Sequence, residues 1–190
     1  MTLLQMAMLD DRALVAADSR IGVGPRGGPF IRGTGKKLFE IGGCAVASFG
    51  ENPPGLDVAK DFILSFTRDH WDPNALSYRI AKSIESLPAR GAFGLLICGA
   101  NGRHIELWEI PAESTKPVQL SLMPGKISTR GTTIADLDRV VQPTRDPRLL
   151  LANMLTVFRA ACAVSEGIGA PYEIASVRQG RPLEVEIFDI

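Results

Sequence analysis

The chain begins with MTLLQMAMLDDRALVAADSR, residues 1–20, and this stretch decides how the rest of the sequence is interpreted. Two short apolar runs, Leu3–Leu9 and Ala13–Ala17, flank the polar pair Asp10-Asp11. Apolar runs of this length around a tight polar turn are typical of a β-hairpin. The second run ends abruptly at Asp18-Ser19-Arg20, so charged side chains end a strand that is otherwise apolar. We interpret that end of the hairpin as facing a site.

Beyond the hairpin, strand signals come in pairs and helical signals are grouped. The expected strands are Leu38–Ile41, Cys44–Phe49, Phe93–Cys98, His104–Ile110, Val118–Leu122, Lys126–Thr129, Glu173–Val177 and Leu183–Phe188. Helical spacing of apolar residues predicts helices over Leu56–His70, Ala75–Leu87 and Pro147–Ala163. The glycine-rich segment Gly22–Gly28 is expected to be a loop. Because paired strands favour antiparallel sheets covered by helices, we expect an α+β fold in one domain over residues 1–190.

The composition excludes several classes of function. The net charge is zero, with 21 basic and 21 acidic residues, so nothing indicates binding to nucleic acid. No uninterrupted apolar run approaches the ~20 residues of a membrane helix, and no signal peptide is evident. The three cysteines lie in apolar surroundings and are expected to be reduced. We therefore expect a cytoplasmic protein that does not act at a membrane.

Familiar ligand motifs are absent or incomplete. The residues GVGPRG at 22–27 match the dinucleotide pattern by letter, but the prolines around them do not open a helix. Gly33–Lys37 lacks the first glycine and the final Ser or Thr of a phosphate loop. Neither His70 nor His104 has a second ligand at metal-binding spacing. We expect no cofactor and no metal.

Three side chains form a set that could carry chemistry: Thr2, Asp18 and Lys37. If Met1 is removed, Thr2 acquires a free α-amine, whose reference pKa of about 7.7–8.0 lets it accept the hydroxyl proton near neutral pH. A lysine cation nearby would lower the pKa of that amine, and a carboxylate would hold the lysine in place.

The hairpin geometry makes this hypothesis testable. Strand side chains alternate between two faces, so a three-residue turn, Asp10-Asp11-Arg12, would place Thr2 and Asp18 on the same face. A two-residue turn would place them on opposite faces. We therefore predict a three-residue turn or a bulge.

The same residues carry a resemblance to a known family. Thr2, the motif AADSR (Ala16–Arg20) and the motif KKLFEI (Lys36–Ile41) resemble β-type subunits of the proteasome family, including the bacterial peptidase partners of ATP-dependent unfoldases. The segments CAVASFGE (Cys44–Glu51) and GAPYEIASV (Gly169–Val177) extend the likeness over most of the chain. The resemblance implies an N-terminal-nucleophile (Ntn) hydrolase fold, a four-layer αββα sandwich with two stacked antiparallel sheets.

The resemblance also implies roles for individual residues. Thr2 would be the nucleophile and its amine the proton shuttle, with Lys37 as activator and Asp18 orienting that lysine. Arg20 would support the neighbouring loop, and the main-chain N–H of Ser48 would stabilise the oxyanion.

Further positions follow from the same alignment. Gly50 is the alternative oxyanion donor. Gly131 stands where the family usually has a serine that contacts the terminal amine, with Thr132 or Thr133 as a possible substitute. Glu166 stands near the family's second supporting aspartate.

The function implied is a threonine peptidase in a homo-oligomeric ring, acting on peptides or unfolded proteins, with an ATPase as a possible partner. Two alternatives stay open. One is a catalytically silent family member that serves in assembly, and the other is a stand-alone Ntn amidase. All catalytic versions require that the bond between Met1 and Thr2 is cut.

Overall fold

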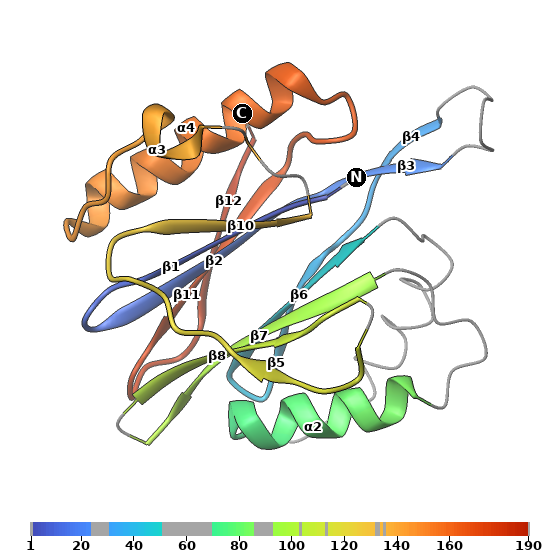
Figure 1. The fold of residues 1–190 in the computed structure, drawn as a ribbon, viewed down its shortest axis with the longest axis vertical. Helices are drawn as coiled ribbons and strands as arrows, with labels where there is room; N and C mark the ends of the chain where they lie inside the picture. The colour runs from blue at the N-terminus through green and yellow to red at the C-terminus, as the bar shows by residue number, and fades with distance from the viewer. Residues whose placement is uncertain are drawn as a thin grey trace.

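The structure of the chain is a computed structural model that describes residues 2–23, 31–50, 70–85, 93–102, 104–112, 114–131, 134 and 136–189. Nearly all of the predicted helix Leu56–His70 lies outside these residues, as do Thr132, Thr133 and the end of the predicted helix Ala75–Leu87. The described part is an α+β sandwich of two antiparallel sheets with helices packed on them (Figure 1).

The first sheet contains the N-terminal hairpin at its centre and has the strand order β10-β1-β2-β11-β12. Its strands are β10 (Ile127–Gly131), β1 (Leu3–Met8), β2 (Arg12–Asp18), β11 (Tyr172–Arg178) and β12 (Glu184–Phe188). All neighbouring pairs are antiparallel. The two ends of the chain thus meet in one sheet, because β2 pairs with β11.

The second sheet follows chain order, β5-β6-β7-β8-β9. Its strands are β5 (Leu38–Ile41), β6 (Cys44–Gly50), β7 (Phe93–Asn101), β8 (His104–Ile110) and β9 (Val118–Gln119). The β5–β6 turn uses Gly42 and Gly43, with φ of 53° and 79°, values that favour glycine in two-residue hairpin turns. The last strand has two residues where the sequence predicted five, Val118–Leu122.

Three elements of the described chain were not predicted. Strands β3 (Arg20–Val23) and β4 (Ile31–Thr34) form a two-stranded sheet, although a loop was expected from residue 22. A short helix, α3 (Leu137–Val140), precedes the long helix α4 (Pro147–Val164). Glycine and proline around residues 22–29 hide the strand signal, because both residues weaken strand propensity.

Both long helices begin at a proline that follows an aspartate cap. Helix α2 (Pro73–Ile84) has Asp72 as its N-cap, whose carboxylate accepts the Ala75 N–H at 2.9 Å. Asp146 caps α4 in the same way, accepting the Arg148 N–H at 2.8 Å. Proline is well tolerated after each cap, because the N–H that it lacks would have no acceptor within the first helical turn.

Three apolar clusters hold the layers together. The cluster between the sheets includes Leu4, Met6, Val15, Leu38 and Leu96. Helix α4 covers the outer face of the first sheet, and α2 covers the outer face of the second (Figure 1). The prediction of an α+β fold with two antiparallel sheets is confirmed.

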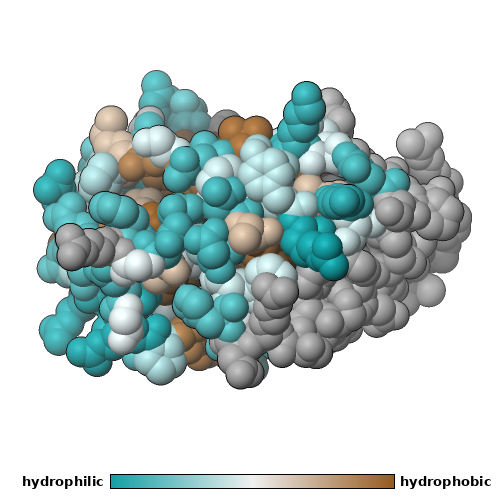
Figure 2. All heavy atoms as spheres, turned by 90° about the horizontal axis from the view of Figure 1, so that it is seen from below, coloured by the Kyte–Doolittle hydropathy of each residue, from teal (hydrophilic) through white to brown (hydrophobic). Residues whose placement is uncertain are grey.

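Figure 2 shows the molecule from below, and the described residues on that face are mostly hydrophilic.

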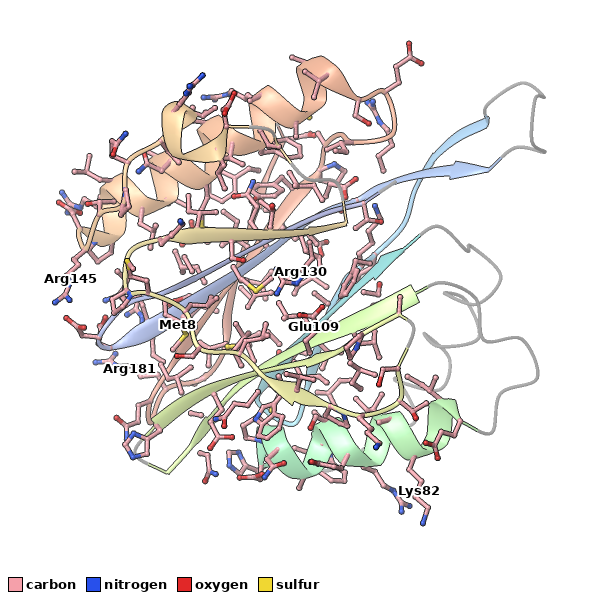
Figure 3. All side chains as sticks on the ribbon, in the orientation of Figure 1. Met8, Lys82, Glu109, Arg130, Arg145 and Arg181 are labelled. Carbon is pink, nitrogen blue, oxygen red and sulfur yellow. The ribbon has the colours of Figure 1, made fainter. Side chains whose placement is uncertain are left out.

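An ion pair also joins the two sheets. Arg130 of β10 and Glu109 of β8 point toward one another, with Nε and Oε2 2.9 Å apart (Figure 3). The arginine also donates to the Thr129 carbonyl.

Helix α4 is, within the described residues, the one helix long and apolar enough to cross a membrane by length and composition. One face of α4 packs onto the first sheet through Leu150, Met154, Val157, Phe158 and Ala161.

Candidate active site

The turn of the N-terminal hairpin differs from the prediction. Leu4 pairs with Ala17, and the Leu9 N–H donates to the Arg12 carbonyl at 2.7 Å. The turn therefore has two residues, Asp10-Asp11, and the prediction of a three-residue turn or bulge is wrong. By the alternation of the strands, positions 2 and 18 belong to opposite faces of the hairpin.

The Asp18 carboxylate still reaches the start of the chain, by another route. Asp18 is the last residue of β2, and its Oδ1 accepts the main-chain N–H of Leu3 at 2.8 Å. The contact runs to the backbone beside Thr2 rather than to its side chain. The side chains of Thr2 and Asp18 therefore need not lie on the same face of the hairpin. The turn prediction was wrong because it assumed that they must.

Lys37 and Asp18 form a buried ion pair that connects the two sheets. The Lys37 Nζ lies 2.9 Å from the Asp18 Oδ1, and the side chains are 3% and 0% exposed. Asp18 ends a strand of the first sheet, whereas Lys37 immediately precedes β5 of the second. The second carboxylate oxygen accepts the Arg20 N–H at 3.2 Å, so both oxygens have donors.

Burial shifts the pKa of both members of this pair. It raises the pKa of the Asp18 carboxyl, an effect that the Lys37 cation and the Leu3 N–H oppose. Burial likewise lowers the pKa of Lys37, and the Asp18 carboxylate opposes that shift. Perturbed charged groups with specific partners are typical of functional sites, although structural ion pairs share this property.

Thr2 is 5% exposed and is enclosed on one side by the edge strand β10. Leu3 pairs with Gly131, whose φ is 78°. A Cβ atom at position 131 would collide with the Thr2 carbonyl oxygen. Glycine is thus required there both by its conformation and by the close approach of the backbone.

Arg20 ties the hairpin to the loop after α4. Its Nη1 donates to the main-chain carbonyls of Glu166 and Ile168, each at 3.1 Å. Gly169 makes room for the guanidinium, since a Cβ atom there would meet it. Glu166 contributes a carbonyl to this contact, while its side chain lies at the exposed surface.

The expected oxyanion donor Ser48 is not available in this structure. Its N–H donates to the Lys37 carbonyl at 2.9 Å, as part of the β5–β6 ladder. The paired register of β5 and β6 ends at Leu38 and Ala47, so it does not extend to Gly50. The N–H of Gly50 points toward the β5 side by the alternation of the strand, which makes Gly50 the better candidate of the two.

Two neighbours of the ion pair carried no signal in the sequence. Tyr172 of β11 pairs directly with Asp18 and stacks on Phe158, with ring centroids 4.2 Å apart. Burial raises the pKa of the Tyr172 hydroxyl, and the Asp18 charge adds to this. These rings help exclude water from the carboxylate. Only long-range strand pairing places them there, so no local pattern could have identified them.

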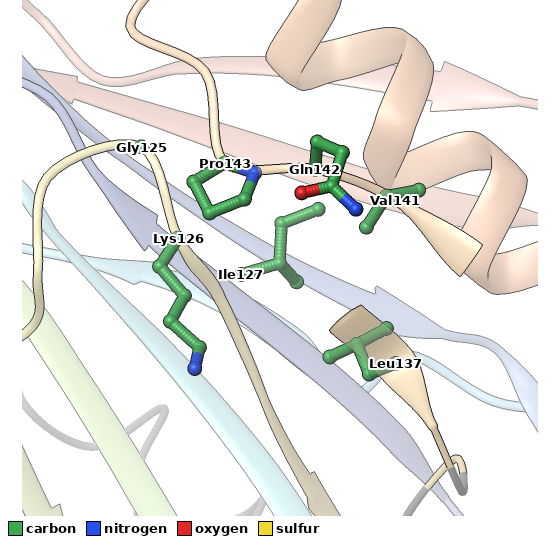
Figure 4. Close-up of a pocket in the computed structure, with 7 residues that line it drawn as sticks. All are labelled: Gly125, Lys126, Ile127, Leu137, Val141, Gln142 and Pro143. Carbon is green, nitrogen blue, oxygen red and sulfur yellow. The ribbon is translucent and has the colours of Figure 1, made fainter. Parts of the chain in front are cut away.

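Within the described residues, no group of three or more His, Cys, Asp or Glu side chains is placed to hold a metal ion. Burial raises the pKa of the Cys44 thiol to about 12, so it is not an activated nucleophile. A pocket under α3 is lined by Gly125, Lys126, Ile127, Leu137, Val141, Gln142 and Pro143 (Figure 4). Its volume of about 10 Å³ has room for at most one water molecule.

Comparison with solved structures places this fold among known ones. The chain is similar to a mutant of Anbu from Hyphomicrobium sp. strain MC1, with a TM-score of 0.76 and 14% identity over 100% of this chain and 87% of that chain. It is also similar to Anbu (ancestral β-subunit) from Yersinia bercovieri, with a TM-score of 0.74 and 14% identity over 100% of this chain and 88% of that chain. No protein-family model and no curated protein matches the sequence. The likeness shows a proteasome-related fold.

Proposed function

We propose that this chain is a threonine peptidase of the proteasome β type, with the four-layer αββα architecture of the Ntn hydrolases and Thr2 as its nucleophile. The observation that carries the proposal is the buried pair of Lys37 and Asp18, held against the Leu3 N–H at the start of β1. A buried ion pair is weak evidence for stability, because removing two charges from water costs several kcal/mol per ion. Its position directly beside Thr2 supports a catalytic purpose.

Removal of Met1 frees the α-amine of Thr2. That amine takes the proton from the Thr2 hydroxyl while the Oγ1 attacks the carbonyl carbon of a peptide bond. The C–N bond breaks, the leaving amine receives the proton, and an ester joins the substrate to Thr2. Water then hydrolyses the ester, with the amine again acting as the base. The Lys37 cation lowers the pKa of the amine and so favours its neutral form, and Asp18 holds that cation in place.

The oxyanion that forms during both steps requires an N–H donor. We assign this role to Gly50 in place of Ser48, because the Ser48 N–H is already bonded to the Lys37 carbonyl. A single donor of this kind contributes ~2.7–4 kcal/mol to transition-state stabilisation.

We propose further that the chain forms a homo-oligomeric ring in the cytoplasm and cleaves peptides or unfolded proteins, with an ATPase as a possible partner. Exposed apolar side chains support a role in association: Leu149 and Val164 lie near opposite ends of α4, and Val185 and Ile187 lie on the edge strand β12. Exposed apolar groups and sheet edges often mark interaction sites.

Peptide hydrolysis by the Met1-free chain tests the proposal. Intact mass first establishes that Met1 is absent, and native mass establishes the oligomer. Wild type is expected to cleave fluorogenic peptides, whereas Thr2→Ala is expected to be inactive. Thr156→Ala, on an exposed face of α4, is the matched control and should match wild type. Equal rates for wild type and Thr2→Ala would contradict the proposal and favour a silent assembly subunit. An active monomer would instead indicate a stand-alone amidase.

A further inference from the structure

We propose that a cavity between the start of α4 and the outer face of the first sheet binds a small organic monocarboxylate with an apolar body. This inference goes beyond the proposed function and does not depend on it. Its basis is a cavity lined by three arginines, two of whose lining residues carry a buried polar atom without a hydrogen-bond partner among the described residues.

The cavity lies at the turn end of the β1–β2 hairpin, under the helix that covers the first sheet (Figure 1). Its volume is about 170 Å³. A cavity of about 150 Å³ holds a molecule of the size of benzene, so this one has room for a small organic ligand. Arg12 begins β2 and Asp18 ends it, which puts roughly 20 Å between the cavity and the candidate active site.

Three guanidinium groups come to this cavity from three different elements. Arg12 and Arg178 are direct partners in the β2–β11 ladder, and Arg148 lines the cavity from the first turn of α4. Like charges directly opposite in a sheet are destabilising, which favours an anion between them. The helix N-terminus is not the donor, because Asp146 already accepts the N–H groups of Arg148 and Leu149.

Three carboxylates lie near these arginines, and all three are exposed. Asp11 accepts hydrogen bonds from Nε and Nη2 of Arg12, and the Glu184 Oε2 lies 3.6 Å from Nη2 of Arg178. Among the described residues that line the cavity, Glu186 is the only acidic one. Water screens exposed carboxylates, so they leave a buried donor of Arg178 unsatisfied.

Two buried donors beside the cavity have no acceptor in the part of the chain that the structure describes. They are Nε of Arg178 and the hydroxyl of Ser176. The two residues are alternate positions of β11, so both side chains lie on the same face of the sheet. Buried polar groups are nearly always hydrogen-bonded, so two such orphans in one cavity require an explanation. A carboxylate has two acceptor oxygens and can bind both donors.

Apolar side chains favour an organic anion over an inorganic one. Leu14, Leu151 and Ile174 also line the cavity, and Leu14 is the direct partner of Ser176 in the β2–β11 ladder. Arginines alone would bind phosphate as readily as a carboxylate. Apolar walls with a few polar groups instead suit a ligand that has a hydrocarbon body and one charged end.

The test titrates benzoate into the full chain and follows the methyl groups by 13C NMR. We expect saturable shifts at the methyl groups of Leu14, Leu151 and Ile174, with a dissociation constant on the order of 1 mM. Benzamide has the same shape without the charge, and inorganic phosphate has the charge without the apolar body. Each should bind at least about tenfold more weakly than benzoate.

Three results of these titrations would overturn the inference. One is the absence of saturable shifts with benzoate, and another is a set of shifts confined to methyl groups elsewhere. The third is an affinity for benzamide or for phosphate equal to that for benzoate, because the arginines or the apolar walls would then have no role in recognition.

Arginine variants locate the site. Arg148→Met and Arg178→Met should each weaken benzoate binding about tenfold or more, because each removes a charged donor. Arg159→Met is the matched control: Arg159 is an exposed arginine of α4 that does not line the cavity, and its loss changes the net charge equally. It should leave the affinity unchanged. Glu186→Gln removes the acidic lining residue and should strengthen binding about two- to fivefold.

Thermal unfolding first establishes that each variant is folded. If Arg178→Met is not, Arg148→Met decides, because Arg148 is exposed. An equal loss of affinity in Arg148→Met and Arg159→Met would show that net charge, and not the cavity, governs binding, and would refute the inference.

The two proposals fail separately. Thr2→Ala should bind benzoate as wild type does, because Thr2 lies at the other end of the hairpin. A chain that binds benzoate but cleaves no peptide would contradict the proposed function alone. An active peptidase that does not bind benzoate would contradict this inference alone.

Discussion

The two ends of the β1–β2 hairpin carry ion pairs of similar geometry in opposite surroundings. At the turn, Arg12 and Asp11 lie 2.7 Å apart, with side chains 20% and 63% exposed. At the other end, Lys37 and Asp18 lie 2.9 Å apart and are almost fully buried. The two ion pairs have similar N–O distances and differ in their exposure to water.

Water decides what each pair can do. An exposed pair contributes about 0.2–1 kcal/mol, because solvent already satisfies both charges. A buried pair must offset the loss of hydration, and apolar residues of the same size often stabilise as well or better. The exposed pair is therefore ordinary surface chemistry, whereas the buried pair is the one on which the proposed function rests. The predictions below test this contrast, beginning with the largest expected effect.

Lys37→Met should have the largest effect, because it leaves the Asp18 carboxylate buried without its cation. We expect a loss of about 3–5 kcal/mol in the free energy of unfolding at pH 7, measured by urea denaturation, together with loss of peptidase activity. The double variant Asp18→Asn with Lys37→Met removes both charges and should recover most of the stability but none of the activity. Equal stability of the single and double variants would contradict the contrast.

Gly131→Ala should come next. Alanine at φ 78° is strained, and its Cβ atom would collide with the Thr2 carbonyl oxygen. We expect a loss of about 2–4 kcal/mol, combining backbone strain with displacement of Thr2, and a large loss of activity. Gly180→Ala is the control, because its φ is 64° but no atom of the described residues lies within 4 Å of its Cβ position. It should show the strain alone, in thermal unfolding, and keep full activity.

Glu173→Gln tests a partly buried carboxylate that lacks a strong partner. Within the part of the chain that the structure describes, its Oε2 has no hydrogen bond. Burial raises the pKa of Glu173, and Lys36 opposes the shift. The native state thus binds this proton more tightly than the unfolded state does. Stability from this group is present below the unfolded pKa, near 4.5, and is lost as the pH rises through the folded pKa.

The glutamine variant should therefore have a larger free energy of unfolding than wild type at pH 7. An unpaired buried polar group costs ~1–3 kcal/mol. We expect only part of that gain, because solvent reaches Glu173. The gain should vanish near pH 4. Urea denaturation at the two pH values measures both, and a gain that is larger at pH 4 would contradict the sign.

Asp11→Asn should have the smallest effect. The hydrogen bond from Arg12 lowers the pKa of the Asp11 carboxyl, so its contribution is present above pH 3.8 and is lost as the pH falls. Because the side chain is largely exposed, we expect a change below about 1 kcal/mol at pH 7, and less at high salt. A loss comparable to that of Lys37→Met would remove the distinction between the two ends of the hairpin.

Much of the fold could be predicted because its signals are local. Apolar runs with tight turns identified the strand pairs, and the helical spacing of apolar residues identified α4 from Pro147. Strand β3 and helix α3 were missed, since glycine and proline weaken the first signal and four residues are too few for a helical period.

The site could be predicted in part. The spacing of Thr2, Asp18 and Lys37 identified residues that the fold brings to one end of the hairpin. The prediction required a three-residue turn, whereas the structure has a two-residue turn and a contact from the Leu3 N–H to Asp18. The hydrogen bond from the Ser48 N–H to the Lys37 carbonyl could not be predicted, because the β5–β6 register is not readable from sequence. The position of Tyr172 beside Asp18 depends on pairing between strands more than a hundred residues apart in the chain.

Covalent trapping tests the central claim, that Thr2 is an N-terminal nucleophile, most directly. The full chain is incubated with a peptide vinyl sulfone, an electrophile that forms an ether with an activated hydroxyl, and intact and peptide mass spectrometry locate the adduct. We predict one adduct, on Thr2 of chains that lack Met1, and none in Thr2→Ala. Met1-free wild type without an adduct, or an adduct that persists in Thr2→Ala, would contradict the claim.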